Sequence, residues 1–473
     1  MNGITVKDIV TAAGGRLLAG DPDAAVNNIS LDSRHMEGAD LFIPVIGEKT
    51  DGHRYISGAF ANGAEASFTS EHDAVPEELS AWCCGENGRA LIRVENTVAA
   101  LQAFGLFLRG RLHMPVVGIT GSVGKTSTRE MVSCALSGGL KVTATEGNSN
   151  GQLGVPVTLG RMDETADIAV MEMGMSEPGE MARIAAIAKP DIALMTNIGV
   201  SHIENLGSRE NIFKEKLHIA DGFTENNTLI VNGDDDWLST LKGKTACRLI
   251  TYGLKEGNDL RVKEIVSDGK STRFLLQMNL KELSAEKEVR LNVPGEHNVM
   301  NAMAAVAAAV TAGVDADAAI GALLCYQGFK RRLQWLDAGA LKILDDSYNA
   351  SPESSMAAAK VLADTPCGGR RVMIFADMLE LGAAAPKYHR DVCDFVSTLG
   401  VDALITIGRL AGAGAADSRL LTGSGMTLRS FENNAAAIAA LPELIKAGDT
   451  VLVKGSNSMH LEEIVAALRE MAL

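Results

Sequence analysis

The sequence predicts an α/β protein built from three domains. Two features predict this class. Short apolar runs alternate with alanine-rich stretches of helical periodicity along the chain, which is the pattern of strands and helices that follow one another. The chain also has 473 residues, too many for one hydrophobic core of ordinary size. We therefore expect several α/β units arranged in series.

The expected domain boundaries fall near residues 112 and 332. Residues 1–112 contain strand-like pieces such as LFIPVI and ALIRV between polar turns, which predicts a small N-terminal α/β domain. Residues 113–332 open with PVVGITGSVGKTSTREMVSCAL and continue with ADIAVMEMG and KPDIALMTNIG, which predicts a doubly wound central domain. Residues 333–473 repeat the rhythm in LKILDDSYN, RRVMIFADM, ALITIG and DTVLVKGSNS, which predicts a Rossmann-like C-terminal domain.

The composition argues against several classes of protein. The formal net charge of -15 disfavours a nucleic-acid partner, because binding to a phosphate backbone relies on clustered Lys and Arg. No apolar run approaches the roughly 20 residues that span a bilayer, and the first residues, MNGITVKDIV, lack the features of an export signal. The seven cysteines show no metal-binding spacing, so we expect reduced thiols. We expect a cytoplasmic protein with no membrane insertion.

The clearest chemical signal is the glycine turn GITGSVGKTS, which lies between an apolar strand and a helix. Such a turn directs backbone N–H groups and a helix N-terminus at phosphate oxygens, while a lysine neutralises charge and a hydroxyl reaches Mg²⁺. The sequence therefore predicts a central P-loop-type ATPase domain. The residues expected to bind ATP here are Gly121, Ser122, Gly124, Lys125, Thr126 and Ser127.

Two polar residues follow apolar runs that read as parallel strands. Glu172 lies in AVMEMGMSEPGE and His202 in TNIGVSHIENLGS. Ligands of α/β proteins gather at such strand ends, and a carboxylate and an imidazole there could hold Mg²⁺ directly or through water. Taken alone, each residue reads more readily as a capping or turn residue than as a metal ligand. Lys214, in NIFKEKLHIA, reads by itself as part of a solvated helix face.

Six motifs together resemble the Mur ligases and occur in the order and spacing of that family: TGSVGKTS, TEGNSNGQLGVPVTL, EMGMSEPGE, NIGVSHIENLGS, GEHNVMNAMAA and DDSYNASPES. The similarity spans all three expected domains. The chain looks most like the member that adds D-alanyl-D-alanine, and the turn ADMLELG resembles a motif typical of that member. The N-terminal run LDSRHMEGADLFIPVIGEKTDGHRYISGAFANGA resembles the family's uridine-nucleotide-binding segment. The resemblance implies ATP-dependent ligation of that dipeptide to UDP-N-acetylmuramoyl-tripeptide through an acyl phosphate, a step in peptidoglycan precursor synthesis.

The resemblance also implies a catalytic and metal set. Lys125 and Thr126 would bind the ATP phosphates and Mg²⁺, and Glu172 and His202 would serve two Mg²⁺ ions. Lys214 matches the lysine that is carbamylated in this family, a change that converts a cation into a metal-binding anion. Lys216 is the competing assignment, and the spacing to the following Leu-His-Ile favours Lys214.

A second implied set contacts the nucleotide from the far side. Asn298 and Asn301 are three residues apart and so share a face in the first turn of a predicted helix, suited to a base or sugar. A helix-capping role is open for both from the residues alone. Arg332 and Asp346 match family positions that reach phosphate and ribose from the third domain, and Arg331 offers the same chemistry as Arg332.

A third implied set contacts the two substrates. The N-terminal members match a uridine-nucleotide-binding segment, two asparagines match positions near the muramoyl group, and the C-terminal members face the incoming dipeptide. From the residues alone, each could instead be an ordinary turn residue or a solvated side chain with no contact to substrate. The residues are Ser33, Arg34, Gly47, Asp51 and His53, then Asn148 and Asn150, then Asn349, Asp377 and Lys454.

Other readings share part of this pattern. A sister Mur ligase that adds a different amino acid, or a folate polyglutamate ligase, would have the same ATP motifs. A nucleotide switch would use the glycine turn without ligating anything, but it would not need the C-terminal set of Asp346, Asn349, Asp377 and Lys454. We expect a monomer whose central and C-terminal domains close around the substrates.

Overall fold

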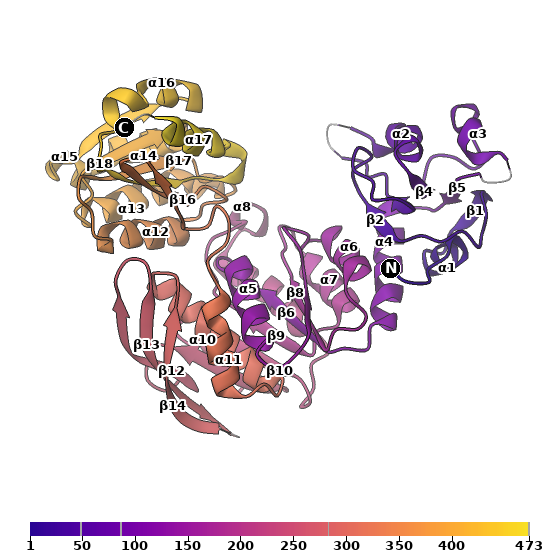
Figure 1. Ribbon diagram of the computed structural model, residues 1–473, viewed down its shortest axis with the longest axis horizontal. Coiled ribbons are helices and arrows are strands. Elements are labelled where there is room, and N and C mark those ends of the chain that lie inside the picture. The colour runs from indigo at the N-terminus through magenta and orange to yellow at the C-terminus, as the bar shows by residue number, and fades with distance from the viewer. Residues whose placement is uncertain (48–49, 86–87, 282, 472–473) are drawn as a thin grey trace.

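The computed structural model describes residues 1–47, 50–85, 88–281 and 283–471. The described chain forms three α/β units in sequence order, each with its own sheet. Figure 1 shows the N-terminal unit set to one side of the central unit, and the C-terminal unit above the opposite end of the central unit. The predicted fold class is confirmed.

The N-terminal unit is a five-stranded sheet of order β1-β5-β4-β3-β2 with helices beside it. Strand β1 runs antiparallel to β5, and the other neighbours are parallel. Its strands are β1 Arg16–Ala19, β2 Asn28–Ser30, β3 Asp40–Phe42, β4 Ala64–Thr69 and β5 Ala90–Arg93, and its helices are α1 Val6–Ala12, η1 Gly52–Tyr55, α2 Ile56–Ala61, α3 Glu77–Cys83 and α4 Thr97–Arg111.

Helix α4 joins the N-terminal unit to the central unit. Asn96 caps its first turn by accepting a hydrogen bond from the N–H of Ala99. Leu101 and Phe104 are fully buried and belong to one apolar cluster that also contains Ile92 of β5 and Val155 of α6. The two units therefore share part of a core, although the sheets are separate.

The central unit is a nine-stranded sheet of order β14-β13-β12-β11-β10-β9-β6-β8-β7. Its strands are β6 Val116–Thr120, β7 Val142–Ala144, β8 Ile168–Glu172, β9 Ile192–Met195, β10 Thr228–Asn232, β11 Arg248–Gly253, β12 Leu260–Ser267, β13 Thr272–Leu280 and β14 Leu283–Leu291. Its helices are α5 Lys125–Leu136, α6 Gly154–Arg161, α7 Glu180–Ala188, α8 Ile203–Leu206, α9 Arg209–Leu217, η2 His218–Ala220, η3 Leu238–Leu241, α10 Glu296–Thr311, α11 Ala316–Ala322 and η4 Leu323–Cys325.

The order of the central strands explains where a ligand can bind. Strand β6 lies between β8 and β9, and all three are parallel. The chain leaves β6 toward one side of the sheet and later crosses to its other side, so β6 is the switch point of the sheet. Ile119 pairs with Glu172 and Thr120 with Met195, which brings three strand ends together at one edge.

Helices cover both faces of the central sheet. Helices α5, α10 and α11 contribute to one buried cluster, in which α10 is a nearly continuous run of buried alanine and valine. Helices α4, α6, α7 and α9 contribute to the cluster on the other face. Burial on both faces explains why β6, β8 and β9 are uninterrupted apolar runs in the sequence.

The C-terminal unit is a six-stranded sheet of order β15-β16-β20-β17-β18-β19, parallel except for β15. Its strands are β15 Gln334–Ala338, β16 Leu341–Asp346, β17 Arg371–Ala376, β18 Ala403–Ile407, β19 Thr427–Phe431 and β20 Thr450–Lys454. Its helices are α12 Pro352–Asp364, η5 Gly382–Ala384, α13 Ala385–Ser397, α14 Arg409–Asp417, α15 Arg419–Gly423, α16 Asn434–Leu444, η6 Asn457–Met459 and α17 Glu462–Glu470.

The fold adds one feature that the sequence did not predict. Strand β12 joins the central sheet parallel to β11, and β13 and β14 follow as antiparallel partners. The turn between β12 and β13 reaches the C-terminal unit at Gly269, where a Cβ on that glycine would lie 2.9 Å from Pro366 Cδ. We keep the boundaries 1–112, 113–332 and 333–473 as a proposal. It is supported by the ends of the three sheets, with α4 as a shared helix.

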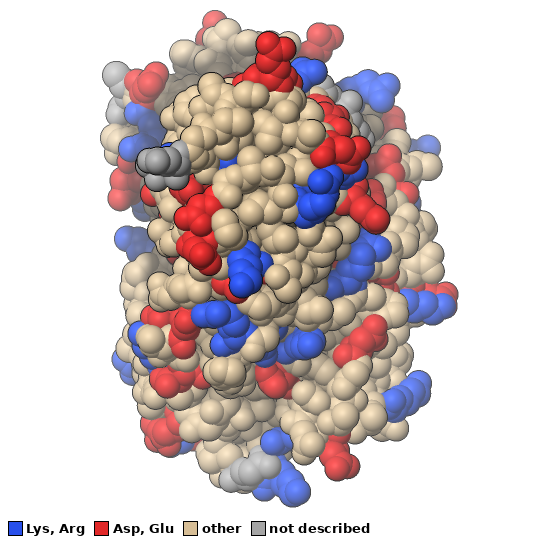
Figure 2. Space-filling view, turned by 90° about the vertical axis from the view of Figure 1, so that its right-hand side faces the viewer, with Lys and Arg blue, Asp and Glu red and all other residues tan. Residues whose placement is uncertain are grey.

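The surface carries charge of both signs. Figure 2 shows the face at the N-terminal end, where acidic and basic side chains are interspersed between larger uncharged areas. Among the described residues, no helix is both long and apolar enough to cross a membrane.

Candidate active site

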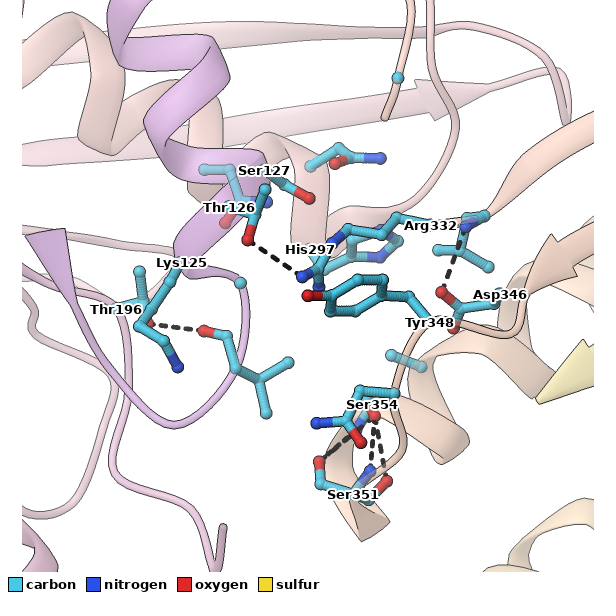
Figure 3. Close-up of a pocket in the computed structure, with 18 of the residues that line it drawn as sticks. Lys125, Thr126, Ser127, Thr196, His297, Arg332, Asp346, Tyr348, Ser351 and Ser354 are labelled. Carbon is cyan, nitrogen blue, oxygen red and sulfur yellow. Dashed lines mark hydrogen bonds between the residues drawn. The ribbon is translucent and has the colours of Figure 1, made fainter. Parts of the chain in front are cut away.

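A cavity of about 910 Å³ lies where the central unit meets the C-terminal unit. Figure 3 shows Lys125, Thr126 and Ser127 on one side and Arg332, Asp346 and Tyr348 on the other. Residues from many separate segments therefore share one space. The predicted residues that line it are Ser122, Gly124, Lys125, Thr126, Ser127, Asn148, Asn150, Glu172, His202, Asn298, Asn301, Arg332, Asp346, Asn349 and Lys454.

The turn after β6 has the backbone of a phosphate-binding loop. Gly124 has a φ of 88° and forms the N-cap of α5, which leaves the first N–H groups of that helix pointing at the cavity. Gly121 has a φ of 148°, and a Cβ there would lie 1.8 Å from Thr196 Oγ1. Gly121 does not itself line the cavity. Its role is to let the loop pass against the segment after β9.

Two cations meet at this loop. The Lys125 ammonium donates a hydrogen bond to the carbonyl of Gly121 at 2.8 Å, so it curls over its own loop. Burial lowers the pKa of Lys125, and Arg332 lowers it further, while Glu172 opposes the shift. Arg332 Nη2 donates to Thr126 Oγ1 at 3.0 Å, and its guanidinium lies 4.3 Å from the Tyr348 ring centroid.

The alternative Arg331 has other partners. Its guanidinium donates to the carbonyl of Ser347 at 3.0 Å and pairs with Glu462 at 2.8 Å. It is therefore held within the C-terminal unit. Arg332 is the arginine that contacts the phosphate-binding loop. Its contact with ATP stays a prediction.

Glu172, at the end of β8, is 1% exposed and is held by two side chains. Asn150 Nδ2 donates to Glu172 Oε1 at 2.7 Å, and Arg129 Nη1 lies 3.3 Å from Glu172 Oε2. Asn150 also donates to Asn148 Oδ1 at 3.0 Å. Sequence reasoning missed Arg129, which is itself 1% exposed on α5; a charged residue in the middle of an otherwise apolar helix face was the available signal.

Three predicted residues of the C-terminal unit form one group. Asp346 and Lys454 are register partners on β16 and β20, and Lys454 Nζ lies 2.6 Å from Asp346 Oδ2. The same ammonium donates to the carbonyl of Asn349 at 2.6 Å. Burial raises the pKa of Asp346 and lowers the pKa of Lys454. The side chain of Asn349 is left at the cavity wall.

The first turns of α10 supply polar groups to the same cavity. Asn298 donates to the carbonyl of Pro294 at 2.7 Å, and Asn301 Oδ1 accepts from Thr128 Oγ1 at 3.0 Å. Both asparagines are buried. Burial lowers the pKa of the neighbouring His297 to about 4, and the charge of Lys454 lowers it in the same direction.

The expectation for Lys214 is corrected by the structure. Its side chain is 65% exposed and pairs with Glu210 on the same helix face at 2.7 Å. Neither Lys214 nor Lys216 lines the cavity, so burial is what separates the two. Lys216 is 1% exposed, and burial holds its pKa well below the usual range, with the charge of Lys125 as the second cause. Positions two apart on a helix face different directions, and the inward one is Lys216.

The expectation for Asp377 is corrected as well. Asp377 does not line the cavity. Its Oδ1 accepts a hydrogen bond from the N–H of Ala411 at 2.7 Å, in the first turn of α14, and its carbonyl accepts from Ser456. Asp377 therefore serves as a helix-capping group between two elements of the C-terminal unit.

The five predicted residues of the N-terminal unit lie apart from the cavity. The guanidinium of Arg34 is 79% exposed and pairs with Asp32 at 2.8 Å. His53 Nε2 accepts from the N–H of Ser70 at 3.0 Å, so Nδ1 carries the proton and donates it to Asp51 at 2.7 Å. The N–H of Gly47 donates a hydrogen bond to the carbonyl of Thr50, and the carbonyl of Ser33 accepts one from the side chain of Asn62. Their role with a uridine nucleotide stays a prediction.

His202 lies at the junction of the two larger units. Its Nδ1 is 2.6 Å from Glu380 Oε2 in the ADMLELG turn, and that contact lowers the pKa of Glu380. Both residues have a φ of 63°, in the left-handed region. Glu380 was not among the residues that the sequence singled out.

Comparison with known proteins identifies the family. The profile of the Mur ligase middle domain matches residues 119–309, that of the Mur ligase, glutamate ligase domain matches residues 331–457, and that of the Mur ligase family, catalytic domain matches residues 25–106. The chain belongs to the Mur ligase family, which confirms the resemblance seen in the motifs.

Individual relatives extend the similarity over the full chain. The chain is 34% identical over 472 residues to the UDP-N-acetylmuramoyl-tripeptide--D-alanyl-D-alanine ligase of Bacillus subtilis (strain 168), with 99% of each chain covered. A crystal structure of MurF from Acinetobacter baumannii superposes with a TM-score of 0.85 at 30% identity and 99% coverage of both chains. MurF ligase from Thermotoga maritima in complex with ADP matches with a TM-score of 0.75 at 25% identity, covering 94% of this chain and 97% of that one.

Proposed function

We propose that this protein joins D-alanyl-D-alanine to UDP-N-acetylmuramoyl-tripeptide with conversion of ATP to ADP and phosphate, in peptidoglycan precursor synthesis. The observation that carries the proposal is a single cavity shared by a phosphate-binding loop, a buried carboxylate and a cation-rich edge of a second domain. A nucleotide switch has no need of that second edge. The relatives with full-length similarity bear the name of this reaction.

The cavity suits a nucleoside triphosphate. Lys125 and the N-terminus of α5 offer a cation and free N–H groups for the phosphates. Arg332 Nε is buried and has no hydrogen-bond partner among the described residues, so it is a donor that a phosphate oxygen would satisfy. Asn298 and Asn301 would then face the sugar or base, and Asp346 would contact the ribose, since all three line the same cavity.

The residues present also fit Mg²⁺. Thr126 offers a hydroxyl and Glu172 a buried carboxylate, and both are the hard oxygen ligands that this ion prefers. His202 lines the same cavity and would act through a bound water, since imidazole is a less usual partner of this ion. Mg²⁺ at these residues would neutralise the negative charge of the phosphates. Two ions are the number that the family resemblance implies.

We assign the family's carbamylated lysine to Lys216. Burial and the nearby Lys125 favour the uncharged amine, which is the form that reacts with carbon dioxide to give a carbamate and a proton. The product would be an anion beside Lys125 and would relieve the repulsion between the two ammonium groups. An anion there could also serve a second Mg²⁺.

The chain's own residues then support two chemical steps. A carboxylate oxygen of the tripeptide takes the γ-phosphoryl group, and Lys125 and Arg332 stabilise the oxygens as charge moves to ADP. The amine of the dipeptide attacks the acyl phosphate, and the tetrahedral intermediate expels phosphate to leave the peptide bond. Asn349 and Lys454 would contact the dipeptide, because both line the facing wall of the cavity.

The remaining substrate contacts follow the domain order. Asn148 and Asn150 would face the muramoyl group, because they line the cavity beside Glu172. Ser33, Arg34, Gly47, Asp51 and His53 would bind the uridine diphosphate end, since they lie in the N-terminal unit. We propose a monomer that works in the cytoplasm, where nucleotide-linked precursors and ATP are both available.

The test is ATP-dependent phosphate release with UDP-N-acetylmuramoyl-tripeptide, comparing D-alanyl-D-alanine, single D- and L-amino acids, and no amine. We expect release that requires the dipeptide. Release that prefers a single amino acid would indicate a sister ligase, and release without any amine would indicate a nucleotide hydrolase or switch.

A further inference from the structure

The segment 197–204 after β9 is attached to the phosphate-binding loop. The N–H of Gly199 donates to Ser122 Oγ at 2.9 Å, and the N–H of Val123 donates to Asn197 Oδ1 at 3.0 Å. The N–H of Ser122 also donates to the carbonyl of Asn197 at 3.0 Å. A shift of this segment would therefore move the loop that we assign to ATP.

Glu353, in the first turn of α12, holds the same segment from the C-terminal unit. Its Oε1 accepts a hydrogen bond from the N–H of Val200 at 3.1 Å. A Cβ on Gly199 would lie 2.6 Å from that oxygen, so glycine is what allows the carboxylate to approach the backbone. Glu353 also lines the cavity.

Glu380 holds the far end of the segment. Its carbonyl accepts from the N–H of Glu204 at 3.3 Å, and its carboxylate lies 2.6 Å from His202 Nδ1. The left-handed backbone of His202 and of Glu380 costs conformational energy, which the interface must offset.

Apolar packing places the segment in the C-terminal core rather than beside it. Val200 is 5% exposed and belongs to the apolar cluster of the C-terminal unit, and Ile203 packs against that cluster. The base of the segment is fixed differently, because Asp235 of the central unit accepts from the N–H of Ile198 at 2.8 Å. Residues 197–198 are thus set by the central unit, whereas residues 199–204 are held from both sides, by Ser122 of the loop and by the C-terminal unit.

We propose that Glu353 and Glu380 are positioning residues through which the docked C-terminal domain sets the phosphate-binding loop for transfer. This inference rests on the proposed function and deepens it. The domain that we assign to the dipeptide would have to dock before segment 199–204 adopts the geometry seen here. Phosphoryl transfer would then be coupled to the presence of the domain that delivers the amine, which limits unproductive loss of the acyl phosphate to water.

The test compares Glu353→Ala, Glu380→Ala and the double variant with wild type. Glu78→Ala is the matched control, because Glu78 is an exposed first-turn carboxylate of α3 in the N-terminal unit. Each interface variant should lower kcat about tenfold, the effect of one charge-assisted hydrogen bond. Affinity for a non-hydrolysable ATP analogue, measured without other substrates, should fall less than kcat, since Lys125 and the first N–H groups of α5 remain available to the phosphates.

Two further readouts separate positioning from general damage. The double variant should be little slower than the slower single variant, because both carboxylates hold one segment. Glu353→Gln should recover most of the rate, because its amide oxygen can still accept from Val200. Rates within about twofold of wild type, multiplicative losses in the double variant, or a loss of analogue affinity equal to the loss of kcat would each overturn the proposal.

Small-angle scattering distinguishes this inference from the proposed function. The interface variants should have a larger radius of gyration than wild type and the Glu78→Ala control when the ATP analogue is bound. If the variants expand but the wild-type protein releases no phosphate in response to the dipeptide, the docking role of the two glutamates stands and the proposed function is overturned. If the wild-type protein is active and the variants are neither slower nor expanded, the proposed function stands and the positioning role is overturned.

Discussion

The cavity between the central and C-terminal units differs from the predicted uridine site in the N-terminal unit. In the cavity, side chains from distant segments contact one another, as Arg332 contacts Thr126 and Lys454 contacts Asp346. In the N-terminal unit, the predicted residues mostly bind near neighbours in sequence, as Arg34 binds Asp32 and His53 binds Asp51. The cavity is therefore an assembled site, whereas the N-terminal residues make local turns.

This difference has a physical meaning. Buried charges such as Asp346 and Lys454 are costly unless they are paired, so their position already constrains the domains before any ligand binds. An exposed pair such as Arg34 and Asp32 contributes little and can rearrange to meet a diphosphate. Substitutions in the cavity should affect turnover, and substitutions in the N-terminal unit should affect mainly the binding of one substrate.

The largest effect is expected for Lys125→Ala. Its ammonium is the cation of the phosphate loop, and removal of a charge-stabilising donor of this kind lowers kcat on the order of 10³-fold. The measurement is the rate of phosphate release with all substrates. Lys141→Ala is the control, because Lys141 is an exposed lysine of the same unit that pairs with Asp163. Turnover at the wild-type rate in Lys125→Ala would exclude this cavity as the site of transfer.

The next effect separates two lysines on one helix. Lys216→Ala should lose about a hundredfold in kcat and regain part of it with formate or acetate, which can replace a carbamate. Lys214→Ala should stay within about twofold, because an exposed i,i+4 pair with Glu210 is worth only a few tenths of a kcal/mol. The opposite pattern would restore Lys214 as the functional lysine.

The half-buried His297, at the cavity wall, should make stability depend on pH. Its pKa is about 4 in the folded protein against 6.5 in the unfolded chain, so the unfolded state takes up a proton first as the pH falls. Stability is then full above pH 6.5 and is lost as the pH falls toward 4, by up to about 3 kcal/mol. Denaturant unfolding of His297→Asn should show a weaker dependence in this window than wild type or the exposed-site control His113→Asn. Equal slopes in all three proteins would contradict the assignment.

Arg332→Ala should raise the KM for ATP about tenfold or more, because a half-buried guanidinium beside the phosphate-binding loop would donate a charge-assisted hydrogen bond to the phosphates. Arg331→Ala should change that KM much less, since Arg331 is occupied by Glu462 and Ser347. Steady-state kinetics with varied ATP decides between the two, and a larger effect at Arg331 would reverse the assignment.

The smallest effect is expected in the N-terminal unit. Arg34→Ala should raise the KM for UDP-N-acetylmuramoyl-tripeptide by up to about tenfold and leave kcat and the KM for ATP unchanged. Arg54→Ala, which changes a nearby arginine outside the predicted set, is the control. A fall in kcat with no change in the KM for the tripeptide would remove the contrast between the two regions.

Much of the fold and the nucleotide site could be predicted from the sequence. The strands β6, β8, β9, β16, β17, β18 and β20 lie where apolar runs predicted them, because buried parallel strands need continuous apolar sequence. Glu172 and Lys454 line one cavity because each ends a parallel strand of its own sheet, and the two sheets direct these strand ends at one another. Arg332 reaches the same cavity from the link between the two sheets.

The remaining residues could not be predicted for physical reasons. Lys214 and Lys216 have the same chemistry, and only the rotation of α9 against its neighbours decides which one is buried. Asp377 lies at the end of a strand as Asp346 does, but its carboxylate accepts a hydrogen bond from the N–H of Ala411 in the first turn of α14. Glu353 and Glu380 act through contacts between domains, and such contacts leave no local pattern in the sequence.

The most direct test of the central claim is an isotope-transfer experiment with UDP-N-acetylmuramoyl-tripeptide whose terminal carboxylate carries ¹⁸O. Ligation through an acyl phosphate moves one carboxylate oxygen to phosphorus, so mass spectrometry should find ¹⁸O in the released phosphate in step with the formation of the pentapeptide product. Phosphate released without ¹⁸O would mean that water, and not the tripeptide carboxylate, accepts the phosphoryl group, and would contradict the account.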